Sequence, residues 1–143
     1  MKIRRGKISD LNELYKLLNK PKELQSGASG TGYSKPWIIV YIKNKKNYLT
    51  LIAEENGEIA GFILAEISKE RKSSFLTDLF VKKEYRGTGL AKKLMSDHEK
   101  LCKRYGIKEV QCIVQIKNKA MLKFMRKVSW KIGHQFYLCG KNI

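Results

Sequence analysis

Three stretches of the chain repeat apolar residues with the spacing of a helix face. The first follows Ser9, a residue type that caps helices, and stops at Pro21; its apolar positions are Leu11, Leu14, Tyr15 and Leu18. The second ends at Gly106, a typical helix-ending residue, and its positions are Leu90, Leu94, His98, Leu101 and Tyr105. The third begins at Asn118 and contains Met121, Leu122, Phe124, Met125 and Val128. Each pattern predicts an amphipathic helix.

Pro36 opens a fourth candidate helix in the stretch WIIVYIKNKK, where the β-branched residues leave a strand possible. The preceding stretch, 22–35, is rich in Gly and Ser, lacks periodicity and is predicted to be a loop. Asn56-Gly57 separates two apolar runs and indicates a tight β-hairpin. The predicted strands are a short one within 2–7, then 48–55, 58–67, 74–81, 110–114, 130–132 and 136–143.

The predicted order of elements is therefore βααβββαβαββ, an α/β fold with a mixed sheet and helices on both faces. A length of 143 residues suits one domain, so we expect a single domain over 1–143. No apolar run is long enough to cross a membrane, and no signal-peptide pattern opens the chain, which predicts a cytoplasmic protein without a membrane partner.

The composition is strongly basic. The chain has 24 Lys and 6 Arg against 13 acidic residues, for a formal charge of +17. Such a charge attracts polyanions, but these lysines are dispersed, so we expect nucleic-acid binding to be non-specific at most. The three cysteines, Cys102, Cys112 and Cys139, are far apart and in apolar contexts, which predicts core residues and no metal site.

The stretch FVKKEYRGTGLAKKLM places Arg86, Gly87 and Gly89 in one turn between a strand and a helix. Small residues there let a backbone approach a ligand closely, and the start of the following helix favours an anion. The dinucleotide fingerprint G-x-G-x-x-G fails because Lys92 stands at its third position, and no Walker A motif is present. The turn is thus either a simple connection or a phosphate-binding site.

The stretch LFVKKEYRGTGLAKKLM resembles the Q/R-x-x-G-x-G/A signature of the GNAT superfamily of N-acetyltransferases. The hairpin IAEENGEIAGFI resembles the second and third strands of that fold, and NKAMLKFMRKVSW resembles its N-x-x-A…FY-x-x-x-GF helix. The resemblance covers nearly the whole chain and the full order of elements. It implies the GNAT fold and an acetyl-CoA-dependent N-acetyltransferase that needs no metal.

The resemblance also implies roles for individual residues in binding the donor. The backbone N–H groups from Gly87 to Ala91 would hold the pyrophosphate, and the residues of the turn expected to bind the donor are Arg86, Gly87, Thr88, Gly89, Leu90 and Ala91. Main-chain groups of Leu79 and Val81 would bind the pantetheine arm, and an N–H near Phe80 would polarise the thioester carbonyl. Asn118 would contact the donor, although a helix cap explains it equally well.

The sequence departs from the family pattern at the residue that donates a proton to the CoA thiolate. Met125 stands at the usual tyrosine, Ser129 at the glycine and Trp130 at the phenylalanine. A thioether donates no proton, so water or another hydroxyl, such as that of Tyr137, would have to do so.

A general base must accept the proton of the amine, and Asp78 and Glu66 are the candidates. Asp78 lies beside the pantetheine strand and is preferred, whereas pairing with a lysine is the alternative explanation for each carboxylate. The resulting prediction is acetyl transfer to a primary amine, on a small molecule or on a protein N-terminus or lysine, by direct attack. The alternatives are a CoA-binding relative without efficient catalysis and a basic nucleic-acid-associated protein. The acceptor is not specified, and a monomer and a homodimer are both compatible with the sequence.

Overall fold

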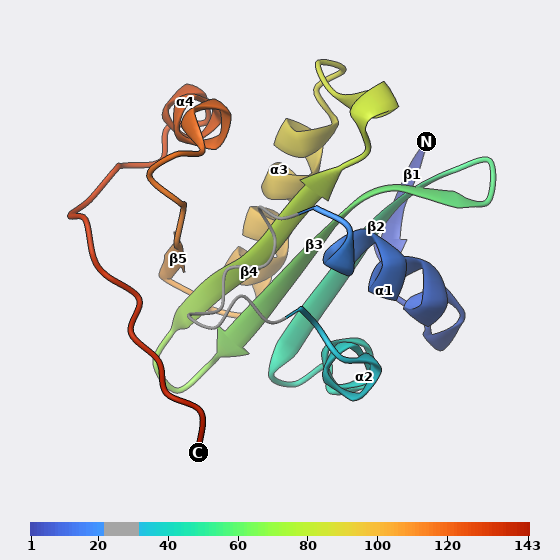
Figure 1. Cartoon of the computed structure of the whole chain (residues 1–143), viewed down its shortest axis with the longest axis horizontal. Helices are drawn as coiled ribbons and strands as arrows, with labels where there is room; N and C mark the ends of the chain where they lie inside the picture. The colour runs from blue at the N-terminus through green and yellow to red at the C-terminus, as the bar shows by residue number, and fades with distance from the viewer. Residues whose placement is uncertain (22–31) are drawn as a thin grey trace.

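A computed structural model of the chain describes residues 1–21 and 32–143. Its centre is a five-stranded sheet in the order β1-β2-β3-β4-β5 (Figure 1). Neighbouring strands are antiparallel except β4 and β5, which are parallel, so the sheet is mixed as predicted. The strands are β1 (Lys2–Arg5), β2 (Tyr48–Glu55), β3 (Glu58–Ser68), β4 (Ser73–Val81) and β5 (Glu109–Cys112).

Helices cover both faces of this sheet, and each face has its own apolar core. The four helices are α1 (Leu11–Asn19), α2 (Lys35–Lys43), α3 (Leu90–Arg104) and α4 (Lys119–Lys127). On one face, α1 and α2 pack onto a core that includes Leu18, Ile38 and Phe62. On the other face, α3 and α4 supply core residues that include Leu94 and Met125. The helical apolar spacing therefore predicted both layers.

The start of α1 differs from the prediction, because Ser9 does not cap the helix. Ser9 lies inside a short 3₁₀ turn, Ile8–Asp10, that precedes α1. The carboxylate of Asp10 accepts a hydrogen bond from the Lys7 amide at 2.7 Å and is also bound by Arg4 at 2.8 Å. A charged acceptor with two partners makes Asp10, rather than the serine hydroxyl, the residue that fixes this helix entry.

The turn between β2 and β3 forms as predicted. Asn56 and Gly57 have φ values of 51° and 79°, the left-handed pair that a two-residue hairpin turn requires. One further candidate element is also confirmed. The stretch opened by Pro36 is the helix α2, whose first turn is capped by the Ser34 hydroxyl accepting from the Trp37 amide.

The two last predicted strands, 130–132 and 136–143, do not form. Residues 131–143, here termed the C-terminal arm, have no regular secondary structure and are exposed throughout. Phe136 and Tyr137 are 83% and 96% exposed, and Cys139 is exposed too, so its prediction as a core residue is wrong. Apolar, β-prone sequence becomes a strand only beside a strand edge, and the arm runs along the outside of the molecule without pairing (Figure 1).

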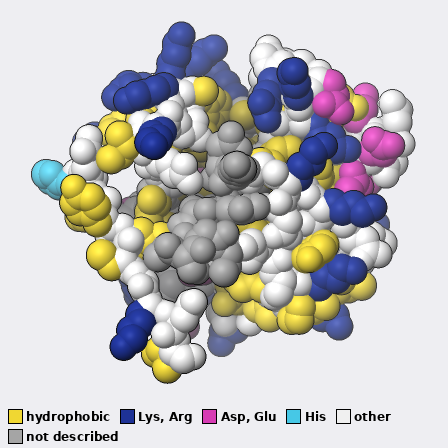
Figure 2. All heavy atoms as spheres, viewed as in Figure 1, with side chains coloured by type: hydrophobic (Ala, Val, Ile, Leu, Met, Phe, Trp, Pro, Cys, Tyr) yellow, Lys and Arg dark blue, Asp and Glu magenta, His cyan; other side chains and the backbone are white. Residues whose placement is uncertain are grey.

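Charged side chains are distributed unevenly over the surface. Acidic groups gather around the β2–β3 hairpin, whereas Lys and Arg lie over much of the rest of the face in view (Figure 2). Several of these acidic groups are paired: Glu54 contacts Arg4, and Glu55 contacts the N-terminal amine. Among the described residues, no helix is both long and apolar enough to span a membrane.

Candidate active site

A bulge in β4 determines which face of the sheet Asp78 occupies. Thr77 is an extra residue, because its neighbours Leu76 and Asp78 pair with consecutive residues of β3. Leu76 packs in the core under α3, whereas Phe80 packs in the core under α1 and α2. One extra residue reverses the face of every side chain that follows it. Asp78 therefore points toward the α1–α2 side of the sheet.

Asp78 is 3% exposed, and only one of its two carboxyl oxygens accepts a hydrogen bond from a described residue. The Tyr33 hydroxyl donates to its Oδ1 at 2.9 Å, while its Oδ2 is buried and accepts no hydrogen bond from the described part of the chain. Burial raises the pKa of Asp78 from 3.8 to about 6, against the opposing effect of the hydrogen bond from Tyr33. A carboxyl with a pKa near neutrality and a free oxygen is suited to accept a proton.

Tyr33 is itself fixed from two directions. The Asn19 side chain, at the end of α1, accepts from the Tyr33 amide at 2.8 Å and donates to the Tyr33 carbonyl at 3.0 Å. The Tyr33 ring packs on Trp37, with ring centroids 4.6 Å apart, and the Trp37 ring packs on Tyr41 with centroids 4.1 Å apart. The Tyr41 hydroxyl in turn donates to Glu66 Oε1 at 3.0 Å. An aromatic row thus joins the two candidate carboxylates.

These contacts separate Asp78 from Glu66. Glu66 is exposed on β3 and bonded to Tyr41, whereas Asp78 is buried and retains an oxygen without a described partner. Neither carboxylate forms an ion pair with a lysine or arginine in the described residues, so lysine pairing does not explain either of them. Asp78 remains the better candidate for a base.

Beyond the bulge, one edge of β4 is open. β5 pairs with Ser73 to Leu76, so the following residues of β4 have no strand beside them on that side within residues 1–21 and 32–143. The Lys82 amide donates to the Ala60 carbonyl of β3 at 2.9 Å, and bonding alternates along an antiparallel pair. By that alternation Phe80 turns its backbone groups toward β3, while Leu79 and Val81 turn theirs toward the open edge. The Val81 carbonyl already accepts a hydrogen bond from Arg86 Nε at 3.0 Å, so the Val81 amide is the backbone group of this residue that faces the open edge for a ligand.

The turn before α3 has the geometry of an anion site. Gly87 and Gly89 have φ values of 76° and 87°, and a Cβ added at either would point into open space. No side chain caps α3, and its first turn has no acidic residue. The first amides of a helix have no acceptor within it, so the amides that follow Gly89 are available to an external anion. The Arg86 and Thr88 side chains bond back to the turn, to Val81 and Tyr85.

The lysines around this turn are not equivalent. Lys82 forms ion pairs with Glu13 at 3.1 Å and Glu58 at 3.6 Å. Burial lowers the pKa of Lys82, but the two carboxylates outweigh burial and raise the pKa above its ordinary value. The charge of Lys82 is therefore already paired within the fold. Lys83, Lys92 and Lys93 are exposed and form no ion pair with a described residue. These three lysines are the free cations beside the turn.

The remaining predicted site residues lie elsewhere. Asn118 caps α4, its Oδ1 accepting from the Met121 amide at 3.0 Å, so the capping role is present. Met125 is 1% exposed and belongs to the core under α3. Tyr137, in the C-terminal arm, is 96% exposed and is not brought against Asp78.

The sequence matches the profile described as the Acetyltransferase (GNAT) family over residues 11–130. The chain belongs to the GNAT family. It is 30% identical to an acetyltransferase of Sodalis glossinidius over 105 residues, which are 71% of this chain and 72% of that protein. A GNAT N-acetyltransferase is therefore the class of this enzyme, as the turn and the order of elements predicted.

Solved GNAT structures share the fold over most or all of the chain. An aminoglycoside acetyltransferase, AAC(6')-Iy, in complex with a CoA-containing bisubstrate analogue, matches with a TM-score of 0.78 and 18% identity over 99% of this chain and 98% of its own. The PaiA N-acetyltransferase of Thermoplasma acidophilum, in complex with coenzyme A, matches with a TM-score of 0.66 and 25% identity over 88% and 86%. These likenesses confirm the predicted fold.

The prediction from sequence missed Tyr33, Asn19 and the bulge at Thr77. Tyr33, Trp37 and Tyr41 recur every four residues, so helical spacing was a signal for one aromatic face. The bond from Tyr33 to Asp78 spans 45 positions and has no local signature. A bulge likewise leaves no pattern in the apolar run of β4.

Proposed function

We propose that this GNAT enzyme transfers the acetyl group of acetyl-CoA to a primary amine by direct attack. The family supports acetyl transfer, and two structures of the same fold are complexes with coenzyme A or a CoA-containing analogue. The AAC(6')-Iy complex holds an analogue of an acetylated amine, neamine. An amine attached to a small molecule or to a protein is the acceptor class proposed here.

The turn before α3 and the open edge of β4 fit the donor. Acetyl-CoA supplies an acyl group activated as a thioester. The amides that follow Gly89 are free to bind its pyrophosphate, and the exposed Lys83, Lys92 and Lys93 add positive charge nearby. The outward-facing backbone of Leu79 and Val81 binds the pantetheine arm as an added strand would.

The Leu79 amide, rather than that of Phe80, is placed to stabilise the negative charge that develops on the carbonyl oxygen. This assignment follows from the alternation in the β3–β4 pair, in which Phe80 bonds toward β3. Leu79 also directly follows Asp78 in β4. The donor of the oxyanion hydrogen bond and the base thus come from adjacent residues.

Asp78 accepts the proton of the attacking amine, directly or through one water. The single observation that carries this role is its buried Oδ2, which accepts no hydrogen bond from a described residue, on a carboxyl whose pKa burial raises to about 6. Tyr33 holds the other oxygen and so fixes the orientation of the group. At pH 7 most Asp78 carboxyls are ionised and able to take a proton.

The CoA thiolate receives its proton from water in this scheme. Met125 has no proton to give and is enclosed in the core. The exposed Tyr137 hydroxyl is the alternative donor, and a Tyr137→Phe variant with unchanged turnover would leave water as the source. Coenzyme thiolates leave readily, so methionine in place of tyrosine at position 125 does not prevent turnover.

The test is a screen of amines and peptide N-termini for acetyl-CoA-dependent release of free thiol. With an accepted amine, Asp78→Asn should lower kcat/KM by about 10²-fold or more, because general-base catalysis contributes 10²–10⁴-fold. Glu66→Gln is the matched control and should retain most activity. Equal activity in Asp78→Asn and the parent would remove Asp78 as the base, and no thiol release with any amine would contradict the proposed reaction.

A further inference from the structure

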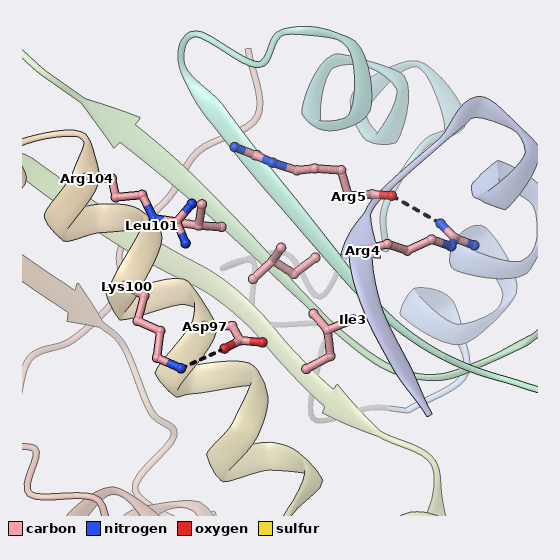
Figure 3. A pocket seen from close by; sticks show the side chains of 8 residues that line it. Ile3, Arg4, Arg5, Asp97, Lys100, Leu101 and Arg104 are labelled. Carbon is pink, nitrogen blue, oxygen red and sulfur yellow. Dashed lines mark hydrogen bonds and ion pairs between the residues drawn. The ribbon is translucent and has the colours of Figure 1, made fainter.

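A cavity lies between β1, β2 and the C-terminal half of α3 (Figure 3). Its volume is about 360 Å³, within the range of small-molecule sites. The helix α3 has 15 residues, so its ends are roughly 20 Å apart. The turn at Gly89 is at one end and this cavity is at the other. The cavity is lined by Ile3, Arg4, Arg5, Leu51, Asp97, Lys100, Leu101 and Arg104.

Arginine is concentrated in this lining. The chain has 24 Lys and only 6 Arg, yet the cavity takes three of the arginines and one lysine. Random placement of basic residues on this chain would give mainly lysines. Arginine differs from lysine in its planar fork of donors, which matches the oxygens of a phosphate or a carboxylate in pairs. The composition of the lining therefore indicates recognition of an anion.

The basic side chains differ in how far their charges are neutralised. Arg4 points away from α3 and is paired with Asp10 and Glu54, so it belongs to the structure of the fold. Lys100 contacts Asp97 at 3.3 Å, across one turn of α3. Neither Arg5 nor Arg104 forms an ion pair with any residue in the ranges 1–21 and 32–143.

Arg5 is held in place without being neutralised. Its guanidinium donates to the hydroxyl of Tyr105, the residue that follows α3, so a neutral partner orients it toward the helix. Arg104 is in the last turn of α3, where a cation also interacts favourably with the helix dipole. The helix dipole is thus sufficient to explain Arg104. It does not explain Arg5, which comes from β1, is oriented by Tyr105 and forms no ion pair with a described residue.

Apolar side chains form the rest of the cavity. Ile3 and Leu101 are half-buried and leave hydrocarbon surface in the cavity beside Asp97, whereas Leu51 is 3% exposed and is already covered by the fold (Figure 3). An anion alone would leave this surface wet, whereas a ligand with an apolar part would cover it. The volume suits a small molecule rather than an extended polymer.

The geometry points to a binding site for a small organic phosphate, whose phosphate contacts Arg5 and Arg104 and whose apolar part covers Ile3 and Leu101. The site is separate from the donor-binding turn. Because the charge of Lys100 is offset by Asp97, the net positive charge of the site comes from Arg5 and Arg104, and two guanidinium groups match a doubly charged phosphate better than a single carboxylate.

Phenyl phosphate is a suitable probe because it combines a phosphate with an apolar ring. In the full-length protein with saturating coenzyme A, titration followed by amide NMR should perturb residues 3–5 and 97–105. Inorganic phosphate and benzoate should each bind at least several-fold more weakly. Perturbation confined to the turn at 86–92, or equal binding of all three probes, would overturn the inference.

Arg104→Gln should weaken phenyl phosphate binding by about tenfold, since it removes a charge-assisted hydrogen bond that solvent partly screens. Arg126→Gln, on α4, is the matched control and should bind like the parent. Arg104 is exposed, so thermal unfolding should confirm that both variants are folded. An equal loss in both variants contradicts a specific site. Tighter, steeply salt-dependent binding of an RNA oligonucleotide, lost in Arg104→Gln, would assign the arginines to nucleic acid instead.

Discussion

The carboxyl group of Asp78 ionises with difficulty in the folded chain because burial removes the water that would solvate its charge. Its folded-state pKa is about 6 and its ordinary value is 3.8. Between these two pH values the folded state holds the proton more tightly than the unfolded state. The free energy of unfolding therefore falls as the pH rises from about 4 to about 6 and stays lowered above that window.

Asp78→Asn should consequently raise stability at pH 7 while it lowers activity. Two pKa units correspond to on the order of 2–3 kcal/mol, which is the upper limit of the expected gain. Asparagine keeps an oxygen for Tyr33 but carries no charge to desolvate. Thermal unfolding at pH 4 and pH 7 measures this: the variant's advantage should appear at pH 7 and vanish at pH 4. An Asp78→Asn protein less stable than the parent at pH 7 would mean that the carboxylate is compensated in the folded state.

Met125 is the second residue at which sequence and structure give different expectations. Its place in the family pattern invites replacement by tyrosine, yet it is 1% exposed in an apolar core. Met125→Tyr should lower stability by about 1–3 kcal/mol through overpacking, while Met125→Leu should cost less than about 1.5 kcal/mol. Urea unfolding of both variants measures the difference. A Met125→Tyr protein with parental stability and raised turnover would show that this position reaches the leaving thiolate.

The residues of the candidate site were predictable to the extent that they lie in local motifs. Gly87 and Gly89 are recognisable because a turn between a strand and a helix confines their role to a few positions. Asp78 was identified by its place beside that strand, but its burial, which raises its pKa, depends on the bulge at Thr77, and its orientation depends on the hydrogen bond from Tyr33. Contacts between distant segments leave no trace in local spacing, so these were not predictable.

At the scale of elements, α3 offers an internal comparison between its two ends. Gly89 precedes the helix and Gly106 follows it, both with positive φ and both with open space where a Cβ would stand. Valine is strained in that conformation at either position, so each variant should lose about 1–2 kcal/mol of stability.

Coenzyme A binding should distinguish the two variants. Gly89→Val should weaken it by tenfold or more, because its side chain enters the space in which the anion approaches the helix amides. Gly106→Val should bind coenzyme A like the parent. Calorimetric titration of both variants measures this, and equal affinities would show that the turn is not the donor site.

The elements themselves were largely predictable because each has a local cause. The period of apolar residues gave α1, α3 and α4, and Asn56-Gly57 gave the β2–β3 hairpin. The last two strands were predicted on β-propensity alone and are absent. Propensity describes a residue that fits a sheet, whereas a strand also requires an edge to pair with, and only tertiary structure supplies one.

At the scale of the whole molecule, the charge of +17 is divided among roles by the fold. Lys82 is paired with Glu13 and Glu58, whereas Lys83, Lys92 and Lys93, near the turn at Gly89, form no ion pair with a described residue. We therefore expect these three lysines, rather than Lys82, to contribute to capture of a polyphosphate ligand.

Replacing Lys83, Lys92 and Lys93 with Gln should weaken coenzyme A binding roughly three- to tenfold at low salt, since each exposed interaction contributes less than about 1 kcal/mol. The loss should shrink as salt is added. The control replaces Lys43, Lys45 and Lys46, which are equally exposed at the end of α2, and should bind normally. Filter binding with a generic RNA should show weak, salt-sensitive association in the parent. A comparable loss of coenzyme A affinity in the control would mean that net charge acts without regard to position.

Because the C-terminal arm is exposed and lacks regular structure, we expect proteases to cleave it readily. Its residues are exposed, and the backbone bonds of the sheet end at β5, so cutting the arm breaks no strand pairing. Lys131 stands at its beginning, and trypsin-like cleavage there would release the stretch IGHQFYLCGKNI while leaving the half-buried Trp130 bonded to Glu99. Removal of residues 132–143 should therefore leave the fold intact. The shortened form would lack Tyr137 but keep Asp78, the turn at Gly89 and the arginine-lined cavity.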